Sequence, residues 1–276
     1  MTIKPYVQPF VKIIRTKKDL YNLRRYCNTD YYSQISSLKN KESGKRCFII
    51  GNGPSLKIAD LDRIKDDCFA CNRIYCLYDK TEWRPKFYGI QDPKVMDAIV
   101  DAGELKKSFD GCKYVFLPYQ MRNKFGELLG NNKSRLFYKR YISIYSKDGK
   151  HQEGFIPFSD DMNKGLYDGM SITYGLMQLA VFMGYKEIYL LGIDHNYSMN
   201  NGVVDAKNSY AEGIKPIDMS KQLPPELEIC EISFREAKRY ADSHGIIIKN
   251  ATRGGKLEVF ERIDLDDLLS KKEIGT

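Results

Sequence analysis

Residues 46–56 read Arg-Cys-Phe-Ile-Ile-Gly-Asn-Gly-Pro-Ser-Leu, and this stretch decides the fold. The run Arg46-Cys47-Phe48-Ile49-Ile50 is short and mostly apolar, and it stops abruptly at a glycine-rich turn. A short apolar run that ends in such a turn is typical of a buried parallel strand entering a loop before a helix. The stretch therefore predicts one unit of an α/β fold.

The same alternation continues along the chain. Apolar runs predict further strands at 68–71, 86–90, 113–117, 187–193 and 245–249. Amphipathic or apolar segments predict helices at 60–64, 93–100, 171–183 and 232–243. Strands that alternate with helices favour a doubly wound, mostly parallel sheet. We predict a Rossmann-like α/β domain over residues 45–265, followed by a C-terminal tail at 266–276.

Two segments stand outside this alternation. Residues 1–44 are predicted to be an N-terminal helical appendage, in which Leu20, Leu23, Tyr26 and Cys27 recur at helical spacing beside basic residues. Two interpretations stay open for this helix: it lies on a membrane surface, or it packs its apolar stripe on the main domain. Residues of about 130–165 are aromatic-rich and without period, and we interpret them as a lid or small subdomain.

Composition narrows the class of protein. No run of about 18 apolar residues exists, and the N-terminus lacks the apolar core of a secretory signal, so we expect a cytoplasmic protein. Seven scattered cysteines argue against a disulfide framework, and Cys68, Cys71 and Cys76 are interpreted as buried thiols rather than metal ligands. The net charge of +8 comes without a nucleic-acid-binding signature. It favours a phosphate-bearing substrate or peripheral association with the inner face of an anionic membrane.

Polar side chains follow five of the predicted strands, at the point where each strand ends. They are Asn52 with Ser55, Asn72, Asp92, Asp194 with His195, and Asn250 with Thr252. In a parallel sheet of this kind, ligands bind beyond the carboxyl ends of the strands. The sequence therefore predicts one site at this edge of the sheet.

The loop from Gly51 to Ser55 is the strongest candidate for binding an anion. Glycines let a backbone approach a ligand closely, and consecutive amides before a helix favour a phosphate. A side chain at Gly53 is therefore expected to block the ligand. The alternative is a tight turn without a chemical role.

Asp194 and His195 are the candidates for the reaction itself, as a metal ligand and a general base. The alternatives are a helix cap or turn for Asp194 and a satisfied, partly buried ring for His195. Asp92 also has a structural alternative, as the cap of the helix that begins at Pro93.

Three motifs in order resemble a known superfamily. They are the loop at 51–56, Cys71-Asn72-Arg73-Ile74-Tyr75, and the segment 184–194 that ends in Gly-Ile-Asp. Together they resemble the bacterial sialyltransferases of glycosyltransferase family 42. The chain is still more similar to the 6-hydroxymethylpterin diphosphokinase MptE-like domain family, which includes the central domain of motility accessory factors. The segments 72–92 and 250–257 are similar to members from surface-polysaccharide loci.

This resemblance implies a site for cytidine monophosphate. The residues at the positions of Asn52, Gly53, Asn72 and Asp92 would contact the nucleotide. The residues expected to line the nucleotide site are Gly51, Asn52, Gly53, Pro54, Ser55, Asn72, Asp92, Ser171, Thr173, Asn196 and Tyr197.

The chain departs from the sialyltransferase pattern in two places. The tyrosine that supports the donor phosphate falls on Asn196, with Tyr197 adjacent, and no histidine occurs between His195 and His244. His195 is then the best-placed base for the acceptor hydroxyl.

The sequence predicts a glycosyltransferase of surface-polysaccharide or glycoconjugate biosynthesis. Its partners would be a CMP-linked sugar donor and a glycan or lipid-linked glycan acceptor. One alternative is a pyrophosphokinase that acts on a pterin-like alcohol with ATP, with Mg²⁺ held by Asp92 and Asp194. Another is a nucleotide-binding protein without catalysis. No metal site is assigned, and the need for Mg²⁺ and a homo-oligomeric state stay open.

Overall fold

The computed structural model describes residues 21, 23–130, 132–141, 156–200, 203–214 and 226–270. Its main sheet has seven strands in the order β11-β8-β1-β2-β3-β4-β5, and every pairing in it is parallel. The strands are β1 (Arg46–Ile50), β2 (Asp67–Cys71), β3 (Phe87–Gly89), β4 (Tyr114–Pro118), β5 (Arg135–Tyr138), β8 (Glu187–Leu191) and β11 (Ile247–Asn250). The predicted Rossmann-like, doubly wound sheet is confirmed.

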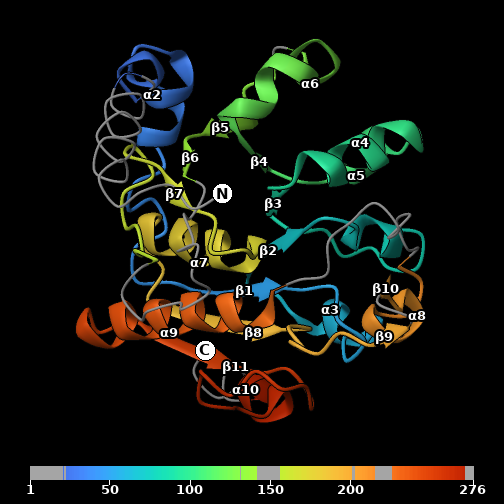
Figure 1. Cartoon of the computed structure of the whole chain (residues 1–276). Helices are drawn as coiled ribbons and strands as arrows, with labels where there is room; N and C mark the ends of the chain where they lie inside the picture. The colour runs from blue at the N-terminus through green and yellow to red at the C-terminus, as the bar shows by residue number, and fades with distance from the viewer. Residues whose placement is uncertain are drawn as a thin grey trace, which may run out of the picture.

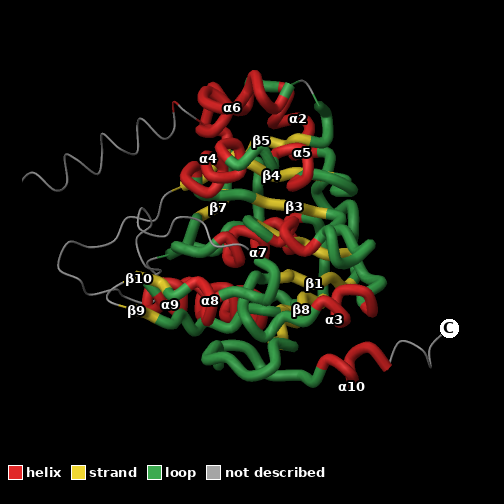
Figure 2. Tube along the Cα trace, turned by 90° about the vertical axis from the view of Figure 1, so that its right-hand side faces the viewer, coloured by secondary structure: helices red, strands yellow, loops and turns green. Residues whose placement is uncertain are grey.

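Helices cover both faces of this sheet (Figure 1, Figure 2). The first face carries α2 (Asp30–Ser36), α7 (Ile172–Phe182) and α9 (Leu227–Ser243). The other face carries α3 (Ile58–Arg63), η1 (Ile74–Leu77), α4 (Pro93–Asp101), α5 (Leu105–Ser108), η2 (Tyr119–Met121), α6 (Arg122–Leu129) and α10 (Leu265–Ser270). The core is therefore divided into two layers, one on each side of the sheet.

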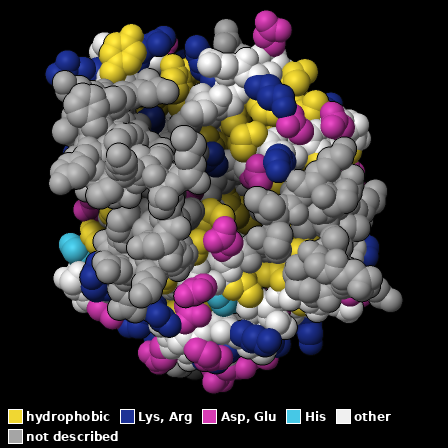
Figure 3. Space-filling model, in the orientation of Figure 1, with side chains coloured by type: hydrophobic (Ala, Val, Ile, Leu, Met, Phe, Trp, Pro, Cys, Tyr) yellow, Lys and Arg dark blue, Asp and Glu magenta, His cyan; other side chains and the backbone are white. Residues whose placement is uncertain are grey.

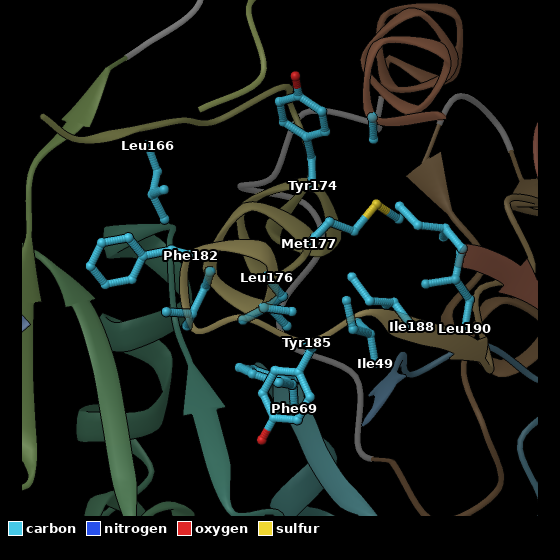
Figure 4. Close-up of a cluster of buried hydrophobic side chains, with 14 of the residues drawn as sticks. Ile49, Phe69, Leu166, Tyr174, Leu176, Met177, Phe182, Tyr185, Ile188 and Leu190 are labelled. Carbon is cyan, nitrogen blue, oxygen red and sulfur yellow. The ribbon is translucent and has the colours of Figure 1, made fainter. Parts of the chain in front are cut away.

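β1 shows why an unbroken apolar run folds as a central strand. Side chains alternate along a strand, so Cys47 and Ile49 belong to the core under α7, whereas Phe48 and Ile50 belong to the opposite core. Figure 4 shows the α7 side of the sheet, where Met177 of α7 and Ile49 of β1 belong to one cluster of buried side chains. Burying a side chain of this size stabilises the fold by about 1.5–3 kcal/mol.

The order in which strands are added to the sheet changes direction at β1. From β1 the strands proceed one after another through β2, β3 and β4 to β5, and the chain then returns to place β8 on the other side of β1. The carboxyl ends of β1 and β8 therefore flank the topological switch point, where doubly wound sheets bind their ligands.

Part of the segment interpreted as a lid belongs to the main sheet, so that interpretation was wrong for β5. β5 pairs with β4 through Val115 and Arg135, and it closes the sheet beneath α2. The short strands β6 (Arg140–Tyr141) and β7 (Leu166–Tyr167) pair beside it. The run Arg-Leu-Phe-Tyr is too short to show a period, and only its partner strand makes it a strand. Residues 142–155 of the expected lid, with His151, lie outside the described residues.

The N-terminal segment is not one continuous helix. Its helix ends at residue 27, a turn at 28–29 follows, and α2 then begins at Asp30. Tyr26, Ile35 and Leu38 are buried, and the Tyr26 hydroxyl donates to the Phe137 carbonyl of β5 at 3.0 Å. Cys27, expected in the apolar stripe, is exposed. The described part of the appendage therefore packs on the main domain.

The polar loop after β8 and the predicted tail also contain regular structure. The loop holds β9 (Met199–Asn200), β10 (Val203–Val204) and α8 (Ala206–Ser209), and α9 begins five residues before the predicted start. Leu268 of α10 is buried, although the tail was expected to begin at residue 266. Within the described ranges, no helix is both long enough and apolar enough to cross a bilayer.

The thiols at Cys68, Cys71 and Cys76 are all buried, as interpreted from the sequence. Burial raises the pKa of the Cys71 thiol to about 12, so this group stays protonated at neutral pH.

Candidate functional site

A cavity of about 510 Å³ lies at the carboxyl ends of β1, β2, β3 and β8. Its size is that of a pocket for a cofactor or substrate of a few hundred daltons. Figure 3, in the orientation of Figure 1, shows the described surface hollowed near its centre, with hydrophobic side chains at the bottom of the hollow. Eleven of the residues expected from the sequence line the cavity: Gly51, Asn52, Gly53, Asn72, Asp92, Ser171, Thr173, Asp194, His195, Asn196 and Tyr197.

Four expected residues are not part of the lining. Pro54 is exposed, and the Ser55 side chain turns to Asp194. Asn250 and Thr252 are buried and hold backbone instead: Thr252 Oγ1 accepts the Ile193 amide at 3.1 Å, and Asn250 Nδ2 donates to the Leu257 carbonyl at 3.0 Å. These residues support the loop after β8 rather than contact a ligand.

The loop after β1 needs glycines because the loop after β8 packs closely against its backbone. The Gly53 amide donates to the Gly192 carbonyl at 2.9 Å, which holds the two loops together. A Cβ at Gly53 would collide with the Asp194 carboxylate and lie 2.8 Å from Gly192 O. The expectation that a side chain at Gly53 would mainly block the ligand is therefore corrected: it would first separate the loops after β1 and β8.

The Asp194 carboxylate is already occupied. Ser55 Oγ donates to Oδ2 at 2.7 Å, and the Ser55 amide donates to Oδ1 at 3.2 Å. Burial raises the pKa of Asp194, and the hydrogen bonds from Ser55 oppose this shift. Asp194 also accepts the Lys256 amide through its carbonyl oxygen at 2.7 Å. Asp194 therefore joins the loops after β1, β8 and β11 by hydrogen bonds. This is closer to the structural alternative, a turn residue, than to a free metal ligand or base.

His195 is placed differently from its neighbour. Its ring is half-buried on the cavity wall, with its centroid 5.8 Å from that of Phe234 in an edge-to-face arrangement. Among the described residues, neither ring nitrogen has a hydrogen-bond partner. Burial lowers the pKa of His195, and Glu231 opposes this shift. The imidazole is therefore neutral at pH 7 and has a nitrogen lone pair that can accept a proton.

The cavity concentrates backbone strain. Asn72, Met170 and His195 line it with φ values of 53°, 56° and 50°, and Asn40 is the single further non-glycine residue with positive φ in the described ranges. A side chain in this left-handed region costs of the order of 1–3 kcal/mol, and such residues cluster at functional sites. The strain identifies this cavity, rather than another surface depression, as the candidate site.

Asn52 presents an unused acceptor at the site. Its Nδ2 donates to the Cys71 carbonyl at 3.1 Å, which fixes the orientation of the amide. Its Oδ1 is buried and has no partner in the part of the chain that the structure describes. A buried acceptor without a partner is costly, so a donor from a ligand would stabilise it.

Asp92 performs the capping role that was the alternative from the sequence. Its Oδ1 accepts the Lys94 amide at 2.9 Å at the start of α4, and the residue is exposed on the cavity rim. Asp92 and Asp194 thus each have a partner of their own. In the described ranges, no group of three or more His, Cys, Asp or Glu residues is arranged to hold a metal ion.

Sequence reasoning missed part of the cavity wall. Gln91, Arg140 and Asp168 line it, as do Tyr210 and Cys230. Gln91 follows a predicted strand directly, so its position at the strand end could have indicated it. Arg140 and Asp168 lie in or beside the segment that showed no period, and only the pairing of β6 with β7 brings them to the site.

Comparisons with known proteins agree with this architecture. The structure of MAf glycosyltransferase from Magnetospirillum magneticum AMB-1 is similar, with a TM-score of 0.52 and 16% identity, over 88% of this chain and 40% of that chain. The sialyltransferase CstII from Campylobacter jejuni, in complex with cytidine-5'-monophosphate, gives a TM-score of 0.47 and 15% identity, over 80% of this chain and 85% of that chain. The first of these likenesses shows a shared fold. The chain spans less than half of that glycosyltransferase.

No curated protein matches the chain. The sequence profile described as 6-hydroxymethylpterin diphosphokinase MptE-like matches residues 19–200, which is more than half of the chain. These residues include the loop after β1, the strained Asn72, and the Asp194–His195 pair. The chain belongs to the 6-hydroxymethylpterin diphosphokinase MptE-like family.

Proposed function

We propose that this protein is a glycosyltransferase that takes a sugar from a CMP-linked donor and passes it to a glycan or lipid-linked glycan acceptor. The observation that carries the proposal is His195, whose ring has no hydrogen-bond partner among the described residues and lies on the wall of a strained cavity at the switch point of the sheet. Sugar transfer needs a nucleotide pocket and a base for the acceptor hydroxyl. In this proposal Asn52 and Asn72 hold the nucleotide and His195 takes the acceptor proton.

The cytidine base is proposed from the motifs. Asn52, Gly53 and Asn72 stand at the positions that contact cytidine monophosphate in the sialyltransferases that the sequence resembles. Asn52 Oδ1, buried and without a partner among the described residues, supports a ligand that donates a hydrogen bond there. The exocyclic amine of cytosine is such a donor.

The family description favours a second candidate, a pyrophosphokinase that uses ATP and Mg²⁺. That reaction needs a metal between phosphate oxygens, held by protein carboxylates. Of the two carboxylates suggested for this role, Asp194 accepts hydrogen bonds from Ser55 on both oxygens, and the exposed Asp92 caps α4 through Oδ1. The glycosyltransferase therefore fits the arrangement of side chains better.

A panel of nucleotides tests the proposal. Binding stabilises the folded state in proportion to the logarithm of ligand concentration over Kd, so a preferred nucleotide gives the largest rise in Tm. We expect CMP to raise Tm more than UMP, GMP or AMP, without a requirement for Mg²⁺. A large rise with ATP and Mg²⁺, and none with CMP, would reject the CMP donor in favour of the pyrophosphokinase.

A further inference from the structure

Arg140 is a cation on the cavity wall without a carboxylate partner among the described residues. It lies on the short strand β6, is partly buried, and lines the cavity. Its Nη1 donates to the Gln91 carbonyl at 2.5 Å, whereas its Nε is buried and has no partner. A guanidinium presents five donors in a rigid fork, so this one has donors left for a ligand.

The N-terminus of α7 and Arg140 line the same cavity. Gln91, whose carbonyl Arg140 holds, donates through Nε2 to the Asp168 carbonyl at 3.2 Å, and the Ser171 amide donates to the same oxygen at 3.0 Å. Arg140 is thus joined through two residues to the N-cap of α7. The helix has eleven residues, and its first amides point out of the helix without partners inside it.

Two hydroxyls at this helix end have no partner among the residues described. Ser171 is the N-cap but makes no side-chain capping bond. Thr173, in the first turn, is only 6% exposed, lines the cavity, and makes no side-chain hydrogen bond. A hydroxyl that faces the cavity without a protein partner can donate a hydrogen bond to a ligand oxygen.

We infer that Arg140 is the charge partner of an anionic group of the substrate, a phosphate or a carboxylate, bound at the N-terminus of α7. The inference rests on the proposed function for the identity of the substrate, but the arrangement itself requires only an anion. Helix N-termini favour anions through their free amides and dipole. The guanidinium adds charge and two parallel donors, which suit the planar pair of oxygens on either group.

Calorimetric titration of cytidine, CMP and CMP-sialic acid into wild type and Arg140→Gln tests the inference. Hydrogen bonds to charged groups are worth enough to weaken binding about 10- to 100-fold when they are lost. A loss for CMP, but not for cytidine, assigns Arg140 to the phosphate. A loss confined to CMP-sialic acid assigns Arg140 to the carboxylate of the sugar.

Three further variants test the charge, the folding and the helix end. Arg140→Lys keeps the charge but not the fork, and we expect an intermediate loss. Arg135→Gln is the matched control, because Arg135 is a partly buried arginine on β5 that lies outside the cavity. It should bind all three ligands as wild type does. Thr173→Val removes the hydroxyl at nearly constant volume and should weaken the same ligand as Arg140→Gln.

Inorganic phosphate separates this inference from the proposed function. At constant ionic strength, phosphate should raise the Tm of wild type more than that of Arg140→Gln, whatever nucleotide the protein uses. If that difference appears while no cytidine compound binds, the CMP donor is wrong and the role of Arg140 stands. Equal stabilisation of both proteins by phosphate, together with equal affinities for every cytidine compound, would overturn the inference.

Discussion

At the scale of single residues, adjacent side chains at the end of β8 have separate tasks. Asp194 accepts two hydrogen bonds from Ser55 and holds loops together, whereas His195 keeps both ring nitrogens free of partners in the described structure. Its positive φ shows that the backbone tolerates strain to place this ring on the cavity wall.

We expect His195→Asn to lower kcat about 10²- to 10⁴-fold, the usual contribution of a general base. Nucleotide affinity should stay close to wild type, because in the proposed site Asn52 and Asn72, and not His195, hold the nucleotide. His244→Asn is the matched control, since His244 is exposed at the end of α9 and outside the cavity. Steady-state kinetics with calorimetry measure both effects. A wild-type kcat in His195→Asn would make this ring structural.

The pH profile gives a second test of the same residue. Burial lowers the pKa of His195 below its ordinary value of about 6.5, so the neutral form that accepts a proton persists to lower pH. The rate should therefore be constant from pH 8 to 7 and fall only below the ordinary histidine pKa. This acidic limb should be absent from the residual activity of His195→Asn.

At the scale of elements, the site depends on how the loops after β1 and β8 hold each other. The Gly53 amide reaches Gly192, and Ser55 reaches Asp194, so both loops share one set of hydrogen bonds. Arg253 also forms an ion pair with the buried Asp60 of α3, which ties the loop after β11 to the same region. These contacts hold the loops together where the nucleotide is proposed to bind.

Ser55→Ala should lower the free energy of unfolding by about 1–3 kcal/mol at pH 7, since Asp194 loses a short hydrogen bond. The folded-state pKa of Asp194 is raised by burial, so its contribution to stability is present at low pH and is lost as pH rises. Without Ser55 Oγ this pKa rises further, and the loss continues to higher pH.

Chemical denaturation at pH 4 and pH 7 measures this effect. The difference between Ser55→Ala and wild type should be larger at pH 7 than at pH 4. Ser37→Ala is the control, because its hydroxyl makes an exposed local bond to Gln34, and it should show a small difference that does not depend on pH. A difference of equal size at both pH values would show that Ser55 does not act through Asp194.

Gly53→Ala should destabilise the protein by about 1–3 kcal/mol, because the new methyl group meets the Asp194 carboxylate and the Gly192 backbone. Gly126→Ala should instead stabilise the protein. Gly126 lies inside α6 with space for a Cβ, and alanine favours a helix over glycine by about 0.5–1 kcal/mol. Thermal denaturation of both variants measures the two changes in stability. An unchanged Tm in Gly53→Ala would show that the two loops can separate without cost.

At the scale of the whole molecule, the N-terminal segment completes the core. Ile35 and Leu38 are buried in the layer that also contains α7 and α9, and Tyr26 binds the backbone of β5. The edge strand β5 is therefore covered by residues that come before β1 in the chain (Figure 1). This segment has a structural role whether or not it also meets a membrane.

Ile35→Ala should cost about 2–5 kcal/mol of stability, as for other fully buried large-to-small changes. Tyr21→Ala, at a side chain that is 61% exposed, should change stability by less than about 0.5 kcal/mol. Denaturant unfolding compares the two. If Ile35→Ala kept wild-type stability and instead lost binding to anionic vesicles, the segment would act as a membrane-surface helix.

The sequence by itself determined the parallel α/β sheet and eleven of the residues that line the cavity. Both follow from local patterns: a run such as Phe48-Ile49-Ile50 must be buried on both faces, and polar residues at strand ends meet at one edge of a parallel sheet. The resemblance to family motifs added the prediction that Asn52 and Asn72 contact a nucleotide. These signals are short in sequence and need no knowledge of distant partners.

Only the tertiary structure decided what each of these residues does. It paired Ser55 with Asp194, 139 residues apart, and left His195 without a hydrogen-bond partner in the described ranges. It made Arg135–Tyr138 a strand and brought Arg140 to the cavity through the pairing of β6 with β7. Hydrogen-bond partners, burial and pKa shifts arise from contacts between segments far apart in the chain, and no local pattern encodes which segments meet.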